Sequence, residues 1–381
     1  MAYWAPAGLE TAAFTFLVLL SLYMYLRRNW LLAAALALAV WVRPEGALVA
    51  IVLTILDAVV YRRLPRYALI SAIIAFVVSM PWLIFKISYY GTILPNPFHA
   101  KTGFDVEQLK SGLEYTGQFF HHYGFFGLGF ILAIIFYKQL SDGLKGILIF
   151  TIIYIIYVSV IGGDVLKVHR FFLPIFGPAA ILVSVGLANL FKNLKNKTVN
   201  LLLFLSAIAL LWLTYKLPLE EVKYYNLAEK TFVSKMNFLA NEIKRTDSTG
   251  FSLAISTIGK FGYELLGHEV IDILGLTDST IARHSQTDIE GLKTTWKERK
   301  YNVKYILERA PDYIVFSTGA KPSAPAEKAL FLYPAFFNSY DPMPWSRKAD
   351  PSQAMGTPNI AFKKVRPVDS DLSNPYPLQY V

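Results

Sequence analysis

The chain has no cysteine among its 381 residues. This absence excludes disulfides, thiolate metal ligands and cysteine nucleophiles. Charged residues are also scarce, at 17% of the chain, whereas soluble domains carry about 25%. Hydrophobic residues make up 54% and aromatic residues 15%. The composition therefore places the chain among membrane proteins before any pattern is considered.

Several motifs that carry well-known chemistry are missing as well. No Walker A or G-x-G-x-x-G motif follows a predicted strand, and no nucleophile elbow is present, so these modes of nucleotide binding and acyl transfer have no support. The net charge of +10 would suit nucleic acid. In so apolar a chain, however, loop lysines and arginines that orient membrane helices explain the charge better. We expect the lipid bilayer as a partner and no nucleic acid.

Eight apolar runs are long enough to cross, or nearly cross, a bilayer, which takes about 20 residues. They lie at 11–26, 29–42, 46–61, 68–87, 124–138, 145–161, 171–191 and 199–215. If every run crosses, the basic loops all fall on one side, which the positive-inside rule makes cytoplasmic. These loops contain Arg27, Arg28, Arg62, Arg63, Arg66, Lys138, Lys145, Lys192, Lys195 and Lys197. We therefore expect a multi-pass protein of the cell (inner) membrane.

The last part of the chain is more polar. Helices are predicted at 226–246 and 299–309, and strands at 252–256, 269–273, 312–317 and 360–365, which is typical of a small α/β domain. The predicted fold is thus mainly α, with a polytopic helical membrane domain at 1–215 and an extracytoplasmic α/β domain at 216–381. Residues 105–122 have the spacing of a helix on the membrane surface, although a simple connector is the alternative.

Charged residues gather in the loops predicted to face outward. The central stretch is Gly162-Gly163-Asp164, followed by His169-Arg170, between two apolar runs. Charges so close to a membrane are costly unless they face water, protein or a partner charge. The full set is Arg43, Glu45, Lys101, Asp164, Lys167, His169 and Arg170. Arginine and lysine suit a phosphate, and a carboxylate can accept a proton.

Simpler explanations exist for these residues. Arg43 and Glu45 can pair to close a turn, and Arg170 can anchor the start of a helix. His121 and His122 are adjacent, which is a poor spacing for metal ligation by one helix face. No metal ligand is therefore assigned from the sequence.

An ordered set of short motifs resembles a known family. The motifs are Gly8-Leu9-Glu10-Thr11, Arg43-Pro44-Glu45-Gly46, Tyr89-Tyr90-Gly91 with Leu94-Pro95-Asn96 and Ala100-Lys101, Gly162-Gly163-Asp164 with Arg170-Phe171, Asp272–Asp278 and Pro311–Val315. Together they resemble the integral-membrane glycosyltransferases of the GT-C class, in particular the terminal arabinofuranosyltransferase-like family.

The resemblance implies an inverting transferase with a polyprenyl-phosphate sugar donor, with arabinofuranose as one candidate sugar, and an extracytoplasmic glycan, lipid or protein acceptor. As hypotheses, Arg43, Lys101 and Arg170 hold the donor phosphate with His169 assisting, and Asp164 is the catalytic candidate, as a group that orients the acceptor, binds a metal or helps as base. Further candidates are Glu10, Glu45 and Asn96. No cofactor is assigned beyond the lipid-linked donor, and a divalent cation is left open.

The chain begins at what resembles the segment after the first two helices and the first external loop of the family. In the family that loop usually carries the catalytic acid. Two alternatives therefore stand beside the enzyme: a transporter or flippase of a lipid-linked sugar, and an inactive, truncated family member that acts as a membrane scaffold. Helix interiors that are nearly free of charge argue against transport.

Overall fold

The computed structural model describes residues 3–4, 8–60, 66–101, 106–166, 168–193, 196–286, 289–295, 298–319, 321–345, 359–369, 372 and 375–376. Among the predicted basic residues, Arg62, Arg63, Lys167 and Lys195 lie outside these ranges. The chain forms two compact units, Met1–Ile93 with Phe104–Lys223 and Leu94–Gly103 with Tyr224–Val381. The predicted boundary at 215/216 falls inside α10 (Lys197–Thr246), a helix shared by both units.

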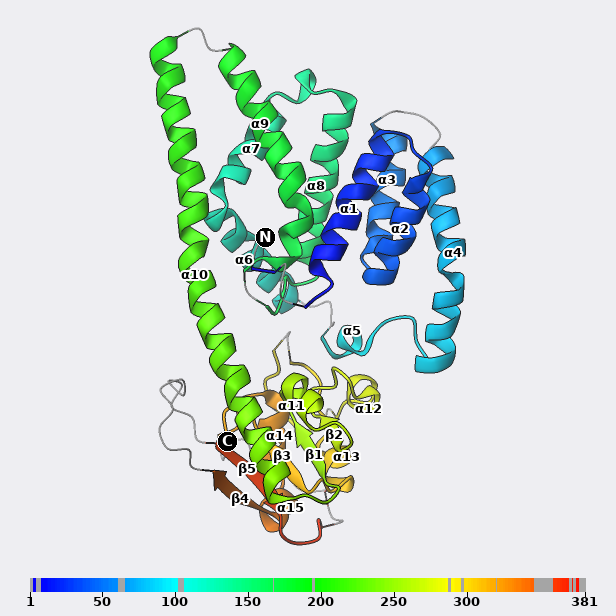
Figure 1. The fold of residues 1–381 in the computed structure, drawn as a ribbon, viewed down its shortest axis with the longest axis vertical. Coiled ribbons are helices and arrows are strands. Elements are labelled where there is room, and N and C mark those ends of the chain that lie inside the picture. Colours follow the sequence, from blue (N-terminus) through cyan, green and yellow to red (C-terminus); the bar gives the residue numbers. More distant parts are fainter. Residues whose placement is uncertain are drawn as a thin grey trace. The chain divides into compact units, whose positions relative to one another are not determined.

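The regular elements of the first unit, within its described residues, are all helices (Figure 1). Its elements are α1 (Thr11–Leu26), α2 (Leu31–Val42), α3 (Gly46–Val59), α4 (Arg66–Tyr90), α6 (Val106–His122), α7 (Gly124–Ile135), η1 (Tyr137–Gln139), α8 (Asp142–Val160), η2 (Arg170–Ile175), α9 (Phe176–Asn193) and the first part of α10. Every predicted apolar run forms a helix. The predicted surface helix at 105–122 corresponds to α6.

Fewer helices than predicted are long enough to cross a membrane. Within the described residues, four are both long and apolar enough: α4, α8, Arg170–Asn193 and α10. The pair α6 and α7, bent by 96°, would make a fifth. Helices α1, α2 and α3 have 16, 12 and 14 residues, below the roughly 17–25 residues of a span. Eight crossings, and the sidedness inferred from them, therefore stay predictions.

Small residues let the helices of this unit approach closely, as is usual where apolar helices pack. Gly129 of α7 lies against Val183 of α9, and a Cβ atom at Gly129 would be 2.9 Å from the Val183 backbone. Gly112 of α6 lies directly on the backbone of Ser159 near the end of α8. One turn further along α6, the hydroxyl of Thr116 is 2.7 Å from that of Ser159. This contact fixes α6 beside the loop that follows α8.

The second unit contains a five-stranded sheet with the order β2-β1-β3-β5-β4. Strands β1 (Ser252–Ile255), β2 (Glu269–Asp272) and β3 (Tyr313–Val315) are parallel, and β5 (Asn359–Lys364) and β4 (Tyr340–Trp345) join them antiparallel. Between them lie α11 (Ile258–Glu264), α12 (Ser279–Arg283), α13 (Val303–Glu308), α14 (Pro325–Phe331) and α15 (Pro334–Ser339). The predicted mainly helical fold with a C-terminal sheet is confirmed.

Side chains alternate between the two faces of this sheet. Leu253 and Val315 pack with the C-terminal part of α10, whereas Ala254 and Ile314 pack with α13, α14 and α15. The sheet is therefore covered on both faces. Residues 96–101, which form α5 (Asn96–Lys101), pack against α12 in the same unit.

The close contact of α6 with α8 gives a stability test. We expect Gly112→Ala to lower the free energy of unfolding by about 1–3 kcal/mol, because the new methyl group overpacks a site occupied by backbone. Gly117→Ala is the control in the same helix, since nothing lies within 4 Å of a Cβ atom there. It should be neutral or slightly stabilising. Thermal unfolding in detergent measures both, and equal effects would contradict the packing.

Candidate functional site

The loop between α8 and η2 is shaped by two glycines. Gly162 and Gly163 have φ angles of +91° and +73°, a region that favours glycine. A Cβ atom at Gly163 would lie 2.6 Å from the side chain of Tyr115. The tyrosine ring of α6 thus packs on the glycine itself. Only glycine satisfies both the backbone angle and the close approach, and the chain then turns so that Asp164 faces inward.

Two further residues of the loop adopt left-handed backbone angles. Val168 has φ 65° and His169 has φ 51°, which is costly for residues with a side chain and especially for a β-branched one. The surroundings hold this conformation in place. The indole N–H of Trp4 donates to the carbonyl of Val168 at 3.0 Å, and Phe172 N–H donates to the carbonyl of His169 at 3.0 Å. Such strain is typical of functional segments.

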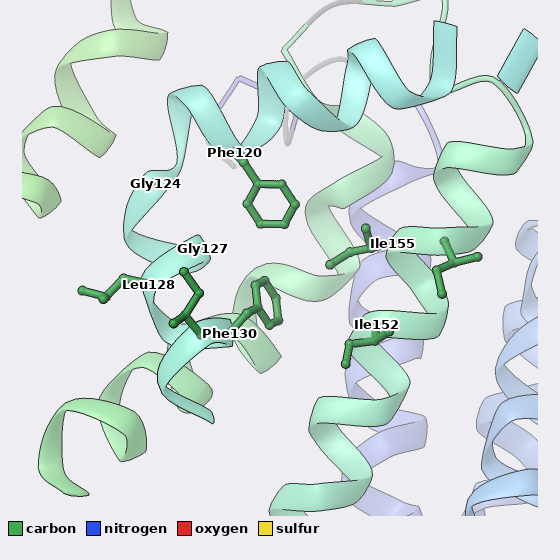
Figure 2. A pocket seen from close by; sticks show the side chains of 9 residues that line it. Phe120, Gly124, Gly127, Leu128, Phe130, Ile152 and Ile155 are labelled. Carbon is green, nitrogen blue, oxygen red and sulfur yellow. The ribbon is translucent and has the colours of Figure 1, made fainter. Parts of the chain in front are cut away.

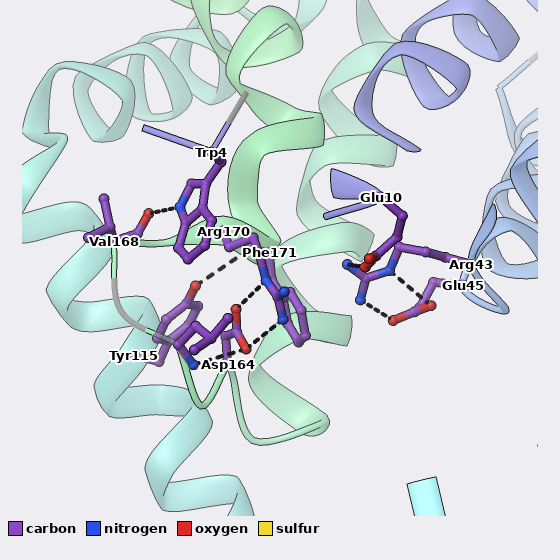
Figure 3. Close-up of polar contacts among 10 residues, drawn as sticks. Trp4, Glu10, Arg43, Glu45, Tyr115, Asp164, Val168, Arg170 and Phe171 are labelled. Atoms are coloured by element: carbon purple, nitrogen blue, oxygen red, sulfur yellow. Dashed lines mark hydrogen bonds and ion pairs between the residues drawn. The ribbon is translucent and has the colours of Figure 1, made fainter. Parts of the chain in front are cut away.

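Asp164 and Arg170 form a bidentate ion pair (Figure 3). Nε of Arg170 donates to Oδ2 at 2.7 Å and Nη2 donates to Oδ1 at 3.0 Å. The backbone N–H of Leu166 donates to Oδ1 at 3.2 Å. The side chains are only 3% and 13% exposed. Burial raises the pKa of the Asp164 carboxyl above its ordinary value, and the Arg170 guanidinium opposes that rise.

A second charged group lies at the turn between α2 and α3. Arg43 donates to Glu45 through Nη2 at 2.6 Å and through Nε at 3.3 Å, and its Nη1 is 3.4 Å from Oε1 of Glu10. The turn is tight, because Gly46 lies on the backbone of Ala39 with no room for a side chain. The structure therefore confirms that Arg43 and Glu45 form an ion pair at this turn, as the simpler interpretation predicted.

Phe171 connects the two charged groups. Its ring centroid is 4.8 Å from the guanidinium carbon of Arg43 and 5.2 Å from that of Arg170, so both cations lie on one aromatic ring (Figure 3). Within the described residues, three carboxylates face these two arginines, a formal balance of −1. An anion here would have to use guanidinium edges that the carboxylates leave open. Among the described residues, none accepts a hydrogen bond from Nη1 of Arg170.

A third polar group lies beside the same loop. Nδ1 of His122 is 2.8 Å from Nε2 of His169 and 3.2 Å from Oε2 of Glu221 in α10. One donor atom from each of the three residues lies within 4.8 Å of the others. Two imidazoles and a carboxylate are a set of groups that can hold a divalent metal ion.

An apolar hollow of about 650 Å³ opens between α6, α7 and α8 (Figure 2). Its lining consists of Phe120, Gly124, Gly127, Leu128, Phe130, Ile131, Ile152, Ile155 and Ile156. Phe120 and Gly124 flank His122 in the chain. The hollow therefore begins within two residues of the third polar group.

The structure brings together some of the predicted site residues but not all of them. Arg43, Glu45, Glu10, Asp164 and Arg170 contact one another or the same ring. His169, predicted with the phosphate ligands, contacts His122 instead. The sequence analysis missed Tyr115 and Glu221, and it set His122 aside as a metal ligand because of its spacing from His121. The sequence signal of His122 and Glu221 is their position at or after the end of an amphipathic or apolar segment, whereas Tyr115 lies inside one.

Two predicted residues belong to the second unit. Asn96 donates through Nδ2 to the carbonyl of Thr277 at 3.3 Å, so it supports the segment after β2. In that segment Asp272 accepts hydrogen bonds from the backbone N–H groups of Leu274 and Thr277, at 3.0 and 2.7 Å. Lys101 ends α5, and its predicted role as a phosphate ligand stays a prediction. Lys167 lies outside the described residues.

Comparison with known proteins identifies one segment. Residues 224–358 match a protein family described as a domain of unknown function (DUF8728). No curated protein and no solved structure matches the chain. The matched segment begins at Tyr224, where the second structural unit also resumes. Two separate observations therefore place a boundary at this residue.

The Asp164–Arg170 pair gives a prediction with a defined pH dependence. We expect Arg170→Ala to destabilise the protein by about 3–5 kcal/mol at neutral pH, because it leaves a buried carboxylate without its partner. Loss of the guanidinium also raises the pKa of Asp164 further above its unfolded value. Such a group stabilises the fold less as pH rises through that interval. The deficit should therefore shrink as the pH is lowered.

Thermal unfolding of the detergent-solubilised proteins over a series of pH values measures this deficit. The control is Arg245→Ala, which removes an exposed pair with Glu242 on α10 and should have little effect at any pH. A deficit for Arg170→Ala that is the same at every pH would argue against an ionised, buried Asp164.

Proposed function

We propose that this protein is an integral-membrane glycosyltransferase of the GT-C type, which moves a sugar from a polyprenyl-phosphate donor to an extracytoplasmic glycan, lipid or protein. The observation that carries the proposal is the charged group at the ends of apolar helices, in which Asp164, Arg170 and Arg43 are largely buried and Glu45 and the more exposed Glu10 pair with Arg43. These residues come from segments far apart in the sequence, and each belongs to one of the motifs that resemble the family.

The surroundings of this group suit a lipid-linked substrate. The start of α1, the turn between α2 and α3, and the loop after α8 each contribute residues to this charged group. In a membrane this level corresponds to the head groups, where a lipid phosphate lies. The apolar hollow next to His122 has the lining that an isoprenoid tail requires. Helix α6 turns by 96° from α7, which agrees with a helix lying along the membrane surface.

The chemistry assigned to the group is an inverting displacement. Asp164 takes the proton of the acceptor hydroxyl, the hydroxyl oxygen bonds to the anomeric carbon, and the bond from that carbon to the phosphate oxygen breaks. The raised pKa of Asp164 makes it a stronger base than an exposed aspartate. Protonation of Asp164 also removes the charge that holds Arg170. The guanidinium is then available to stabilise the departing polyprenyl phosphate as its negative charge grows.

The remaining roles follow the resemblance. Arg43 presents its guanidinium to the ring of Phe171 and is assigned to the donor phosphate with Arg170. His169 is assigned to the same phosphate, and the role of Lys101 as a phosphate ligand stays a prediction from the resemblance alone. Glu10 and Glu45 hold Arg43 in orientation, and Asn96 supports the segment after β2.

Sugar transfer by reconstituted protein tests the proposal. We expect Asp164→Asn to lower turnover by roughly 10²–10⁴-fold, the usual contribution of a general base, because asparagine keeps the shape but accepts no proton. The assay supplies labelled polyprenyl-phosphate pentoses and hexoses, including arabinofuranose, to proteoliposomes with cell-envelope extract, and measures release of polyprenyl phosphate. Asp142→Asn, in an exposed pair with Lys145, is the control.

Two results would overturn the proposal. Normal turnover by Asp164→Asn would remove this residue from the site. Movement of the intact donor across the bilayer without cleavage by the natural sequence would favour the transporter alternative.

The proposed membrane topology can be tested by cysteine labelling. The chain has no native cysteine, so only an introduced cysteine reacts. We expect a cysteine at Val165 to react with an impermeant maleimide added to intact cells and one at Lys138 to react only after lysis. These positions flank α8, whose 19 residues are long enough to cross. Labelling of both positions from outside would contradict a crossing by α8, and the reverse pattern would invert the proposed orientation.

A further inference from the structure

Three side chains from three separate elements converge beside the loop that carries Asp164. His122 ends α6, His169 precedes η2, and Glu221 lies in α10. His122 Nδ1 is 2.8 Å from His169 Nε2 and 3.2 Å from Glu221 Oε2, and one ligand atom of each residue lies within 4.8 Å of the others. The proposed transfer reaction uses His169 alone, and neither it nor the charged groups around Phe171 account for the convergence of all three side chains.

Protons alone satisfy these contacts poorly. A neutral imidazole has one N–H and one lone pair, and Nδ1 carries only one of them. If Nδ1 carries the hydrogen, that hydrogen must be shared between Glu221 and the lone pair of His169. If it carries the lone pair, it faces the carboxylate without a hydrogen between them. A single cation between the three atoms would satisfy every lone pair together.

Glu221 adds an independent observation. Its Oε2 atom is buried, and within the described part of the chain it takes part in no contact with hydrogen-bond geometry. The 3.2 Å distance between this oxygen and His122 Nδ1 is that of an ion pair, but the contact does not have the geometry of a hydrogen bond. A buried carboxylate oxygen without donors is costly unless a positive charge compensates it.

The histidine in the loop is held rigidly for such a role. The His169 ring lies against Tyr115, Phe119 and Tyr123, with centroid distances of 5.4, 5.7 and 5.7 Å. Its backbone is fixed in the left-handed region. Packing that locks the rotamer of a ligand is what makes a metal site precise.

We propose that His122, His169 and Glu221 bind a divalent transition-metal ion of the zinc type. Imidazole nitrogen with one carboxylate oxygen suits zinc rather than magnesium or calcium, which prefer oxygen ligands. In a tetrahedral zinc site with bonds of about 2.0–2.1 Å, ligand atoms lie roughly 3.4 Å apart. The separations from His122 Nδ1 are 2.8 and 3.2 Å and all three ligand atoms lie within 4.8 Å of one another, so metal binding requires side-chain shifts but no change of fold. Three protein ligands leave a fourth position for water or an anionic oxygen.

The ion would join the loop that holds Asp164 to both α6 and α10. It would thus tie the strained segment at Val168 and His169 to two helices at once. This inference concerns the chain's own side chains and does not depend on the proposed transfer reaction.

Metal binding by the full chain, purified in detergent without a histidine tag, tests the proposal. After chelator treatment, we expect one equivalent of Zn²⁺ to rebind and raise the unfolding temperature, and Co²⁺ to give the visible absorption of a tetrahedral site. Glu221→Gln and His122→Ala should each weaken Zn²⁺ affinity by more than roughly 100-fold, since even outer-shell partners of a metal site contribute 10–100-fold. Because glutamine keeps the shape of the glutamate side chain, Glu221→Gln should leave the fold intact, so that weaker binding reports loss of the ligand.

His121→Ala is the matched control. His121 is the exposed neighbour of His122 and takes no part in the convergent group, so its loss should leave Zn²⁺ affinity and the Co²⁺ spectrum unchanged. The proposal fails if the natural sequence binds no Zn²⁺ tighter than adventitious surface histidines do. It also fails if His121→Ala weakens binding as much as His122→Ala.

Discussion

A tyrosine ring packed on a glycine holds the polar part of this molecule in place. Tyr115 lies on Gly163, where no other residue would fit, and its hydroxyl accepts a hydrogen bond from the backbone of Phe171. The ring also stacks on Phe172 and contacts His169. One side chain of α6 therefore positions both ends of the loop between α8 and η2. Asp164, His169 and Arg170 lie in or beside the loop that this contact holds.

Charge balance explains how so many ionised groups are tolerated next to apolar helices. Isolated charges there would be expelled or neutralised. Here Arg43 and Arg170 each have a carboxylate within 2.6–2.7 Å, and both guanidiniums lie close to the ring of Phe171. A site built in this way does not attract an anion by net charge. It responds to one by redistributing charge, since neutralising a carboxylate releases the cation that it held.

The sequence predicted which segments form helices and strands better than it predicted the lengths of these elements or the tertiary contacts between them. The apolar runs form helices because hydrophobic stretches bounded by Gly, Pro and charged residues leave few alternatives. Their ends depend on tertiary turns such as the close approach of Gly46 to Ala39, so α2 and α3 are shorter than a span. Strand β4 was missed because Pro342 and Pro344 lie within it. Proline is tolerated there because β4 is an edge strand.

Residue spacing in the sequence could not predict which distant residues come together in the structure. His122, His169 and Glu221 are separated by 47 and 52 positions, so no local motif relates them. They meet because α6 packs on α8 through Gly112 and because α10 passes the end of α6. The Arg-Pro-Glu-Gly and Gly-Gly-Asp motifs were visible because a turn needs its special residues next to one another. A site assembled from single residues on different helices can be recognised only once the packing of those helices is known. Here the packing depends on Gly112, which lies on the backbone of Ser159, and on Tyr115, which lies on Gly163.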